Sequence, residues 1–368
     1  MSTKTENLEL NIYSRDEKVV DWLSGSDQNF QIIDNTVGKV LTRIEQNSRQ
    51  LASCIDLNEG YGTRVEIYDT LQNAPFNGGT SGVNIGKHLY LFNYDGPLID
   101  YNIDQKTQNS LGIYYAIDRE SEKTQYNNLQ SFMYEGTKIA FNEIIYIFST
   151  NSNIVYEYDV NENCFYPSEL DFSSTPITAF DRALITMAGY TIYIFGIHNG
   201  NSNYSYKVDL VTKNITQISG NGTYMYSVGI PDNNNENIYL LGGIDTSGSD
   251  NLKQIMKYNI ANNNYTQVAT LDYKPSYAMG GSKIKNNIYL FGGIRKGNGF
   301  NRYPENKIQV FNMTHDELIT LELTLPQNLT YVDAFYRRQE IYLIGGKVNT
   351  TSRNQNDKNA IIYKFIEY

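Results

Sequence analysis

The chain is poor in the residues that build disulfides, metal sites and catalytic centres. Its 368 residues include two cysteines, one tryptophan and three histidines. Cys54 and Cys164 are too few for a disulfide framework or for a zinc site with four thiolate ligands. His88, His198 and His315 lie at different points of the repeat described below, so we expect no shared metal centre and no cofactor.

Positive charge and long apolar runs are also scarce. The 30 Lys and Arg residues stand against 40 Asp and Glu residues, a net charge of −10 that disfavours binding to nucleic acid or anionic lipid. No run approaches the roughly 20 apolar residues of a membrane-spanning helix, so no membrane insertion is expected. The first residues, MSTKTENLELNIY, lack the apolar region of a secretory signal, which predicts that the chain does not use the general export route.

Familiar catalytic signatures are missing from the sequence as well. It contains no phosphate-binding P-loop, no G-x-S-x-G nucleophile elbow and no H-E-x-x-H zinc motif. Many of its acidic residues, such as Asp159 and Asp209, fall in turns where a carboxylate caps backbone amides. We therefore assign no catalytic residues and expect the protein not to be an enzyme.

What the sequence does contain is a repeat of about fifty residues. A short apolar run around a tyrosine recurs six times, for example as NIYLLGG and NIYLFGG. The six tyrosines, which we call the anchor tyrosines, are Tyr90, Tyr146, Tyr193, Tyr239, Tyr289 and Tyr342. Their successive separations are 56, 47, 46, 50 and 53, which indicates one structural unit written six times.

Each unit reads as four short strands. An apolar segment and a polar turn precede the anchor strand, and a variable loop follows it. An alternating segment such as QIMKYNI (254–260) then leads through an Asn-rich turn to a fourth strand such as YTQVATL (265–271). Six such units predict an all-β fold, a six-bladed β-propeller over residues 60–368.

Glycine pairs close several anchor strands, and an aromatic or apolar residue followed by Asp or Asn ends the third strands. Both features resemble the kelch repeat, which implies a kelch-like propeller. The glycine pairs are Gly242-Gly243, Gly292-Gly293 and Gly345-Gly346, and the other pairs are Tyr158-Asp159, Val208-Asp209, Tyr258-Asn259 and Phe311-Asn312. Glycine suits the end of a buried strand because it accepts positive φ and lets neighbouring backbone approach closely.

The last unit is incomplete. The chain ends on AIIYKFIEY, which matches a third strand, and no fourth strand follows it. The segment TRVEIYDTL (63–71) has the right length and pattern to supply that strand. We predict that residues 63–71 pair with residues 361–366, so that the two ends of the repeat region close the ring.

Residues 1–50 follow a different pattern, with apolar residues at intervals of 3, 4, 3 and 4. This spacing predicts an amphipathic helix containing Phe30, Ile33, Val37, Val40 and Ile44. The helix either packs on its own propeller or self-associates, most naturally as a trimer.

The same region, Tyr13 to Val40, contains an Asp-Trp-Leu and an Ile-Asp-Asn. It resembles the N-terminal attachment segments of tail-fibre and baseplate-associated proteins of phages and phage-tail-like bacteriocins. The resemblance implies other tail or baseplate proteins as partners, with Trp22 on the docking surface. The alternative role of Trp22 is local core packing.

Two sets of residues are candidates for binding, because the loops between second and third strands vary and lie on one face of a propeller. The first set is on the loop 294–306, where aromatic and guanidinium groups alternate with glycine: Arg295, Asn298, Phe300, Arg302 and Tyr303. An ordinary solvated loop is the alternative.

The second set lies 11 to 13 positions before the anchor tyrosines, near the start of each innermost strand, and is expected to surround the mouth of the central channel or to pack between blades. It comprises Tyr134, Phe180, Tyr226, Tyr277 and Tyr331.

These observations favour a non-catalytic recognition protein. The resemblance of the N-terminal region implies a tail-fibre or baseplate-associated protein that binds a host cell-surface protein or glycan. Such a protein is made in the cytoplasm, joins a virion or phage-tail-like particle and becomes extracellular on lysis. The alternative is an intracellular kelch-repeat scaffold, and a glycan-active enzyme with carboxylates at the propeller axis is less favoured.

Overall fold

The chain divides into two compact units, Met1–Tyr61 and Gly62–Tyr368. The computed structural model describes residues 3–4, 11–12, 63–71, 80–93, 97–111, 116–118, 121–124, 137–180, 183–199, 202–220, 227–243, 253–271, 275–277, 279–296, 302–348 and 361–367. In the first unit β1 (Thr3–Lys4) pairs antiparallel with β2 (Asn11–Ile12). The predicted attachment helix, with Trp22, Phe30, Ile33, Val37, Val40 and Ile44, lies outside the described residues.

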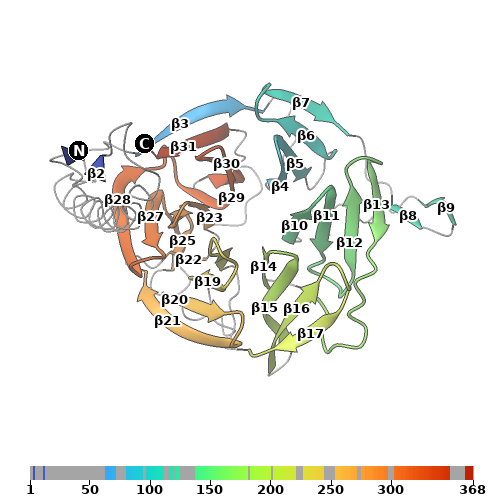
Figure 1. The fold of residues 1–368 in the computed structure, drawn as a ribbon. Helices are drawn as coiled ribbons and strands as arrows, with labels where there is room; N and C mark the ends of the chain where they lie inside the picture. The colour runs from blue at the N-terminus through green and yellow to red at the C-terminus, as the bar shows by residue number, and fades with distance from the viewer. Residues whose placement is uncertain are drawn as a thin grey trace. The chain divides into compact units, whose positions relative to one another are not determined.

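The second unit is a six-bladed β-propeller, as the repeat predicts (Figure 1). Blade 1 consists of β4 (Thr80–Ile85), β5 (His88–Asn93), β6 (Ile99–Asn102) and β7 (Thr107–Ser110). Blade 2 consists of β10 (Thr137–Phe141), β11 (Ile144–Phe148), β12 (Val155–Asp159) and β13 (Cys164–Pro167). Blade 3 consists of β14 (Leu184–Ala188), β15 (Thr191–Asn199), β16 (Ser202–Asp209) and β17 (Ile215–Ile218). A short hairpin, β8 (Ala116–Asp118) and β9 (Ser121–Thr124), extends blade 2 beyond β13.

Blade 4 consists of β18 (Val228–Pro231), β19 (Asn237–Leu241), β20 (Gln254–Asn259) and β21 (Asn264–Thr270). Blade 5 consists of β23 (Gly280–Ile284), β24 (Asn287–Phe291), β27 (Lys307–Asn312) and β28 (Glu317–Thr324). Blade 6 consists of β29 (Leu329–Arg337), β30 (Glu340–Val348), β31 (Ile361–Glu367) and β3 (Thr63–Thr70). The described residues of this unit contain no helix. No helix among the described residues has the length and hydropathy to span a membrane.

The core lies between the blades, and the anchor tyrosines belong to it. Each anchor strand is the second strand of its blade, flanked on both sides, and the six anchor tyrosines are between 2% and 8% exposed. In the cluster between blades 3 and 4, Phe195 meets Tyr258 edge to face with ring centroids 5.2 Å apart. A strand that is covered on both faces needs apolar residues at every position, which explains the continuous apolar runs of the repeat.

In blades 1 to 5 the polar residue that ends the third strand caps the turn that follows it. Asp209 Oδ1 accepts hydrogen bonds of 2.8 Å from the backbone amides of Val211 and Thr212. These amide donors hold the pKa of Asp209 below its ordinary value. Equivalent caps occur at Asn102, Asp159, Asn259 and Asn312. These Asp and Asn side chains therefore stabilise the scaffold.

The glycine pairs occupy the conformation that the sequence predicts for them. Gly292 has φ +63° and Gly293 has φ +103°. A Cβ atom on Gly292 would lie 2.2 Å from the carbonyl oxygen of Leu329 in the next blade. The glycine is therefore required both by its backbone angle and by the close approach of β29.

The ring closes through the two ends of the propeller unit. β3 is the outermost strand of blade 6 and pairs antiparallel with β31, with Thr63 opposite Glu367 and Thr70 opposite Ile361 (Figure 1). This is the pairing expected from the missing fourth strand of the last repeat. Leu71 then leads from blade 6 to blade 1 with only 4% of its surface exposed.

Candidate functional site

The segment after Gly293, expected as a loop, contains two strands of a separate small sheet. β25 (Ile294–Lys296) and β26 (Arg302–Pro304) form a hairpin in which Arg295 lies opposite Tyr303. On its other edge β25 pairs with β22 (Pro275–Tyr277), and Tyr277 lies opposite Ile294. Tyr277 thus belongs to the same sheet as the 294–306 segment and not to the inner strand β23. The structure therefore places one member of the second candidate set, Tyr277, in the same sheet as the first set.

Three side chains at the base of this hairpin form a connected arrangement. Arg295 Nε donates a hydrogen bond of 2.7 Å to Glu305 Oε1. The Arg295 guanidinium lies over the Tyr303 ring, 4.9 Å from its centroid. Tyr303 is 41% exposed and Glu305 is largely buried, so the carboxylate holds the arginine while the tyrosine faces solvent. A partly exposed ion pair of this kind contributes at most about 1 kcal/mol to stability, so its main effect is to fix the exposed Arg295 and Tyr303 side chains in place.

Tyr331 is on β29, two positions after Leu329, whose backbone contacts the base of the hairpin. The Leu329 amide donates to the Glu305 carbonyl oxygen at 3.3 Å, and the Gly293 amide donates to the Leu329 carbonyl oxygen at 2.9 Å. Two residues later Tyr331 has φ +57° and is 40% exposed. Positive φ is unfavourable for a bulky residue, and such strain occurs often at binding sites. We refer to Arg295, Tyr303 and Glu305 as the hairpin surface.

The other candidates are distributed as follows. Arg302 begins β26 opposite Lys296. Phe180 is 2% exposed and packs edge to face on Phe148 and Phe172, so it belongs to the core between blades. Asn298, Phe300, Tyr134 and Tyr226 lie outside the described residues.

The inner strands carry one acidic side chain that the repeat pattern does not predict. β4, β10, β14, β18, β23 and β29 include a single carboxylate, Asp333. Its Oδ2 accepts a hydrogen bond of 2.7 Å from the Gly82 amide, across the junction between blades 6 and 1. Burial raises the pKa of Asp333 to about 6, against the opposing effects of the Gly82 amide and the Lys138 ammonium. The only sequence signal was an aspartate within the apolar stretch YVDAF.

The histidines are far apart in the blade pattern. His88 begins β5, where Nδ1 lies 2.7 Å from Asp100 Oδ1, whereas His198 is on β15 and His315 is in the turn after β27. Within the part of the chain that the structure describes, no three His, Cys, Asp or Glu side chains are grouped as metal ligands.

Comparison with known proteins adds no family, because no protein-family model matches the chain and no curated protein matches it.

Proposed function

We propose that this propeller is a non-catalytic recognition protein that binds its partner through the hairpin surface. The observation that carries the proposal is the exposed Tyr303 ring stacked under the Arg295 guanidinium, which Glu305 holds in place. Tyrosine and arginine are enriched at binding hot spots because they offer a large contact area together with hydrogen bonds. Side chains fixed before binding lose less conformational entropy when a partner docks.

The partner in this proposal is a protein or glycan on a host cell surface, and the protein is a tail-fibre or baseplate-associated component of a phage or phage-tail-like particle. The support is in the sequence of residues 1–50, with its heptad-like spacing and its resemblance to attachment segments. In this role the N-terminal segment joins other tail proteins or two further copies of the chain, and the propeller faces the host. Synthesis in the cytoplasm and release on lysis complete the proposal.

An intracellular scaffold is the second candidate, supported by the glycine pairs and the third-strand pairs that resemble kelch repeats. Oligomeric state distinguishes the two. Light scattering coupled to size exclusion is expected to find a trimer of the full chain that Val37→Asp converts to monomers, because a charge at that position disrupts a helical seam. A stable monomer of the wild-type chain would favour the scaffold.

A further inference from the structure

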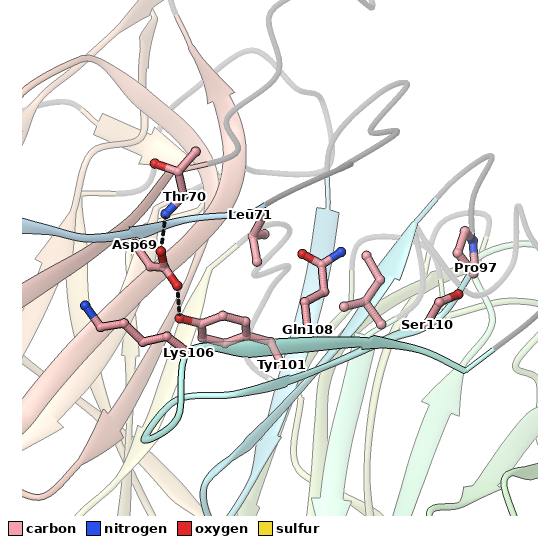
Figure 2. Close-up of a pocket in the computed structure, with 9 residues that line it drawn as sticks. Asp69, Thr70, Leu71, Pro97, Tyr101, Lys106, Gln108 and Ser110 are labelled. Atoms are coloured by element: carbon pink, nitrogen blue, oxygen red, sulfur yellow. Dashed lines mark hydrogen bonds between the residues drawn. The ribbon is translucent and has the colours of Figure 1, made fainter.

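We call the junction of blades 6 and 1 the seam. A pocket of about 460 Å³, the seam pocket, lies there (Figure 2). Its size is within the range of small-molecule sites. One wall comes from the end of β3, and the other comes from β6, β7 and the residues next to them. The lining residues are Asp69, Thr70, Leu71, Pro97, Ile99, Tyr101, Lys106, Gln108 and Ser110.

An irregularity in β3 directs Asp69 into this pocket. The register with β31 passes from Ile67 opposite Tyr363 to Asp69 opposite Ile362, so one extra residue, Tyr68, is accommodated between them. Bulges of this kind redirect side chains and are frequent beside functional sites. The redirected carboxylate faces Tyr101 of blade 1 (Figure 2).

The Asp69 carboxylate is held from two sides and keeps acceptor capacity. Its Oδ2 accepts a hydrogen bond of 2.5 Å from the Tyr101 hydroxyl, and its Oδ1 accepts one of 2.8 Å from the Thr70 amide. Burial and the neighbouring Asp69 raise the pKa of Tyr101 far above its ordinary value, so the phenol stays protonated and donates. A carboxylate has about four acceptor positions, which leaves about two for a ligand.

The wall opposite is also fixed before any ligand binds. Lys106 Nζ donates a hydrogen bond of 2.7 Å to the Tyr68 carbonyl oxygen and lies 4.1 Å from the centroid of the Tyr68 ring. The Tyr68 hydroxyl donates in turn to the Ile103 carbonyl oxygen in blade 1. The ammonium therefore has a defined position, with further donor capacity.

Gln108 on β7 supplies an acceptor without a protein donor. Its Oε1 is shielded from solvent and accepts no hydrogen bond from any described residue. Buried acceptors in proteins nearly always have a partner, and the partly exposed Gln108 side chain gains one when its amide turns toward a donor in the pocket. The hydroxyl-bearing residues Thr70 and Ser110 line the same space, and Leu71 and Ile99 add apolar surface.

We propose that the seam pocket binds one neutral sugar unit at the end of a cell-surface glycan. A sugar ring carries several hydroxyl donors for Asp69 and Gln108, an acceptor for Lys106, and apolar C–H faces for Leu71 and Ile99. One anionic and one cationic side chain offset each other, which favours a neutral ligand. The proposal rests on the proposed recognition function and deepens it, because it names a glycan as the partner class and places it on a site separate from the hairpin surface.

The test is a titration of the full chain with the methyl glycosides of glucose, galactose, mannose and N-acetylglucosamine, followed by saturation-transfer NMR and by thermal melts. We expect at least one glycoside to bind and to raise the melting temperature. Gln108→Leu is expected to weaken that binding at least about tenfold and, without sugar, to melt higher than the wild type, because it removes a buried acceptor that lacks a donor. Ser110→Ala, a smaller change, is expected to weaken binding a few-fold.

The matched control is Asn109→Ala, because this exposed neighbour on β7 points to the opposite face of the sheet and is expected to leave binding unchanged. If no glycoside binds the wild type, or if Gln108→Leu binds equally well, the pocket proposal is overturned. If the protein in that case still binds cells in a way that depends on Tyr303, the proposed recognition function stands without the pocket. If it does not bind cells either, the recognition function and the pocket proposal are both overturned. Glycoside binding that Gln108→Leu abolishes and Tyr303→Ala preserves supports the pocket as a separate site.

Discussion

The carboxylate of Asp333, on the innermost strand of the last blade, accepts a 2.7 Å hydrogen bond from the amide of Gly82, on the innermost strand of the first blade, 251 residues earlier. Arg337 bridges the same seam farther along β29, with Nη2 2.6 Å from Asp104 Oδ2. The pairing of β3 with β31 closes the outside (Figure 1). The propeller is therefore closed near its axis, on its outer edge and between them.

The Asp333 carboxyl should make stability depend on pH. Its pKa of about 6 in the folded protein exceeds the ordinary value of 3.8, so ionisation is costlier in the folded state. This contribution to the free energy of unfolding is fully present below about pH 3.8 and is lost as pH rises through about 6. Asp333→Asn, which keeps an oxygen for the Gly82 amide, should be more stable than the wild type at pH 7.5 by about 2 kcal/mol and no more stable at pH 4.

Chemical denaturation of both proteins between pH 4 and 8 measures this difference. Asp209→Asn is the control with a flat profile, because backbone amides lower the pKa of Asp209 below its ordinary value of 3.8, so its contribution is lost only below that pH and its difference from the wild type should stay nearly constant between pH 4 and 8. A constant difference between Asp333→Asn and the wild type across that range would show that Asp333 does not titrate there.

A pair of glycine substitutions separates backbone strain from steric contact. Gly86 has φ +58° and a Cβ atom added to it would have no neighbour within 4 Å, whereas Gly292 has φ +63° and its added Cβ would lie 2.2 Å from the Leu329 carbonyl oxygen. Gly86→Ala should cost about 1 kcal/mol from the backbone angle alone. Gly292→Ala should cost at least about 3 kcal/mol, because β29 must also move. Equal losses in urea unfolding would contradict the close approach of blades 5 and 6.

Two truncations test ring closure through β3. Removal of residues 1–61 leaves the whole propeller unit, Gly62–Tyr368, and should give a cooperative thermal transition. Removal of residues 1–71 also deletes β3, uncovers one edge of β31 and removes Leu71 from the core, so this product should be unfolded at about 25 °C. Circular dichroism measures the folding of the two products. If the product that lacks residues 1–71 is folded and as stable as the product that lacks residues 1–61, closure by β3 is refuted.

The features that the sequence predicts are those that recur in it. Tyr289 and its five counterparts mark the buried second strands because each occupies the same position in its blade. The closing role of residues 63–71 follows by subtraction, since only one blade lacks a fourth strand. The glycine pairs reveal their positive φ because no other residue adopts it so readily.

The features that escape prediction depend on single contacts between units of the repeat. The orientation of Asp69 depends on a bulge at Tyr68, and the bond from Gly82 to Asp333 joins residues that no local pattern relates. Tyr277 was expected near the start of an inner strand, but β22 pairs with β25, and the inner strand begins only at Gly280. Periodicity identifies the scaffold, whereas the irregular positions make the pocket and the small sheet.

The most direct test of the proposed function is the binding of fluorescently labelled full chain to a panel of intact bacterial cells, compared with Arg295→Ala/Tyr303→Ala. The control is Val211→Ala, which alters a 72% exposed residue in the turn after β16. We predict saturable binding to at least one species, weakened at least about tenfold by the double substitution and unchanged by the control. Absence of binding to every species, or equal binding by the double variant, would contradict recognition through the hairpin surface.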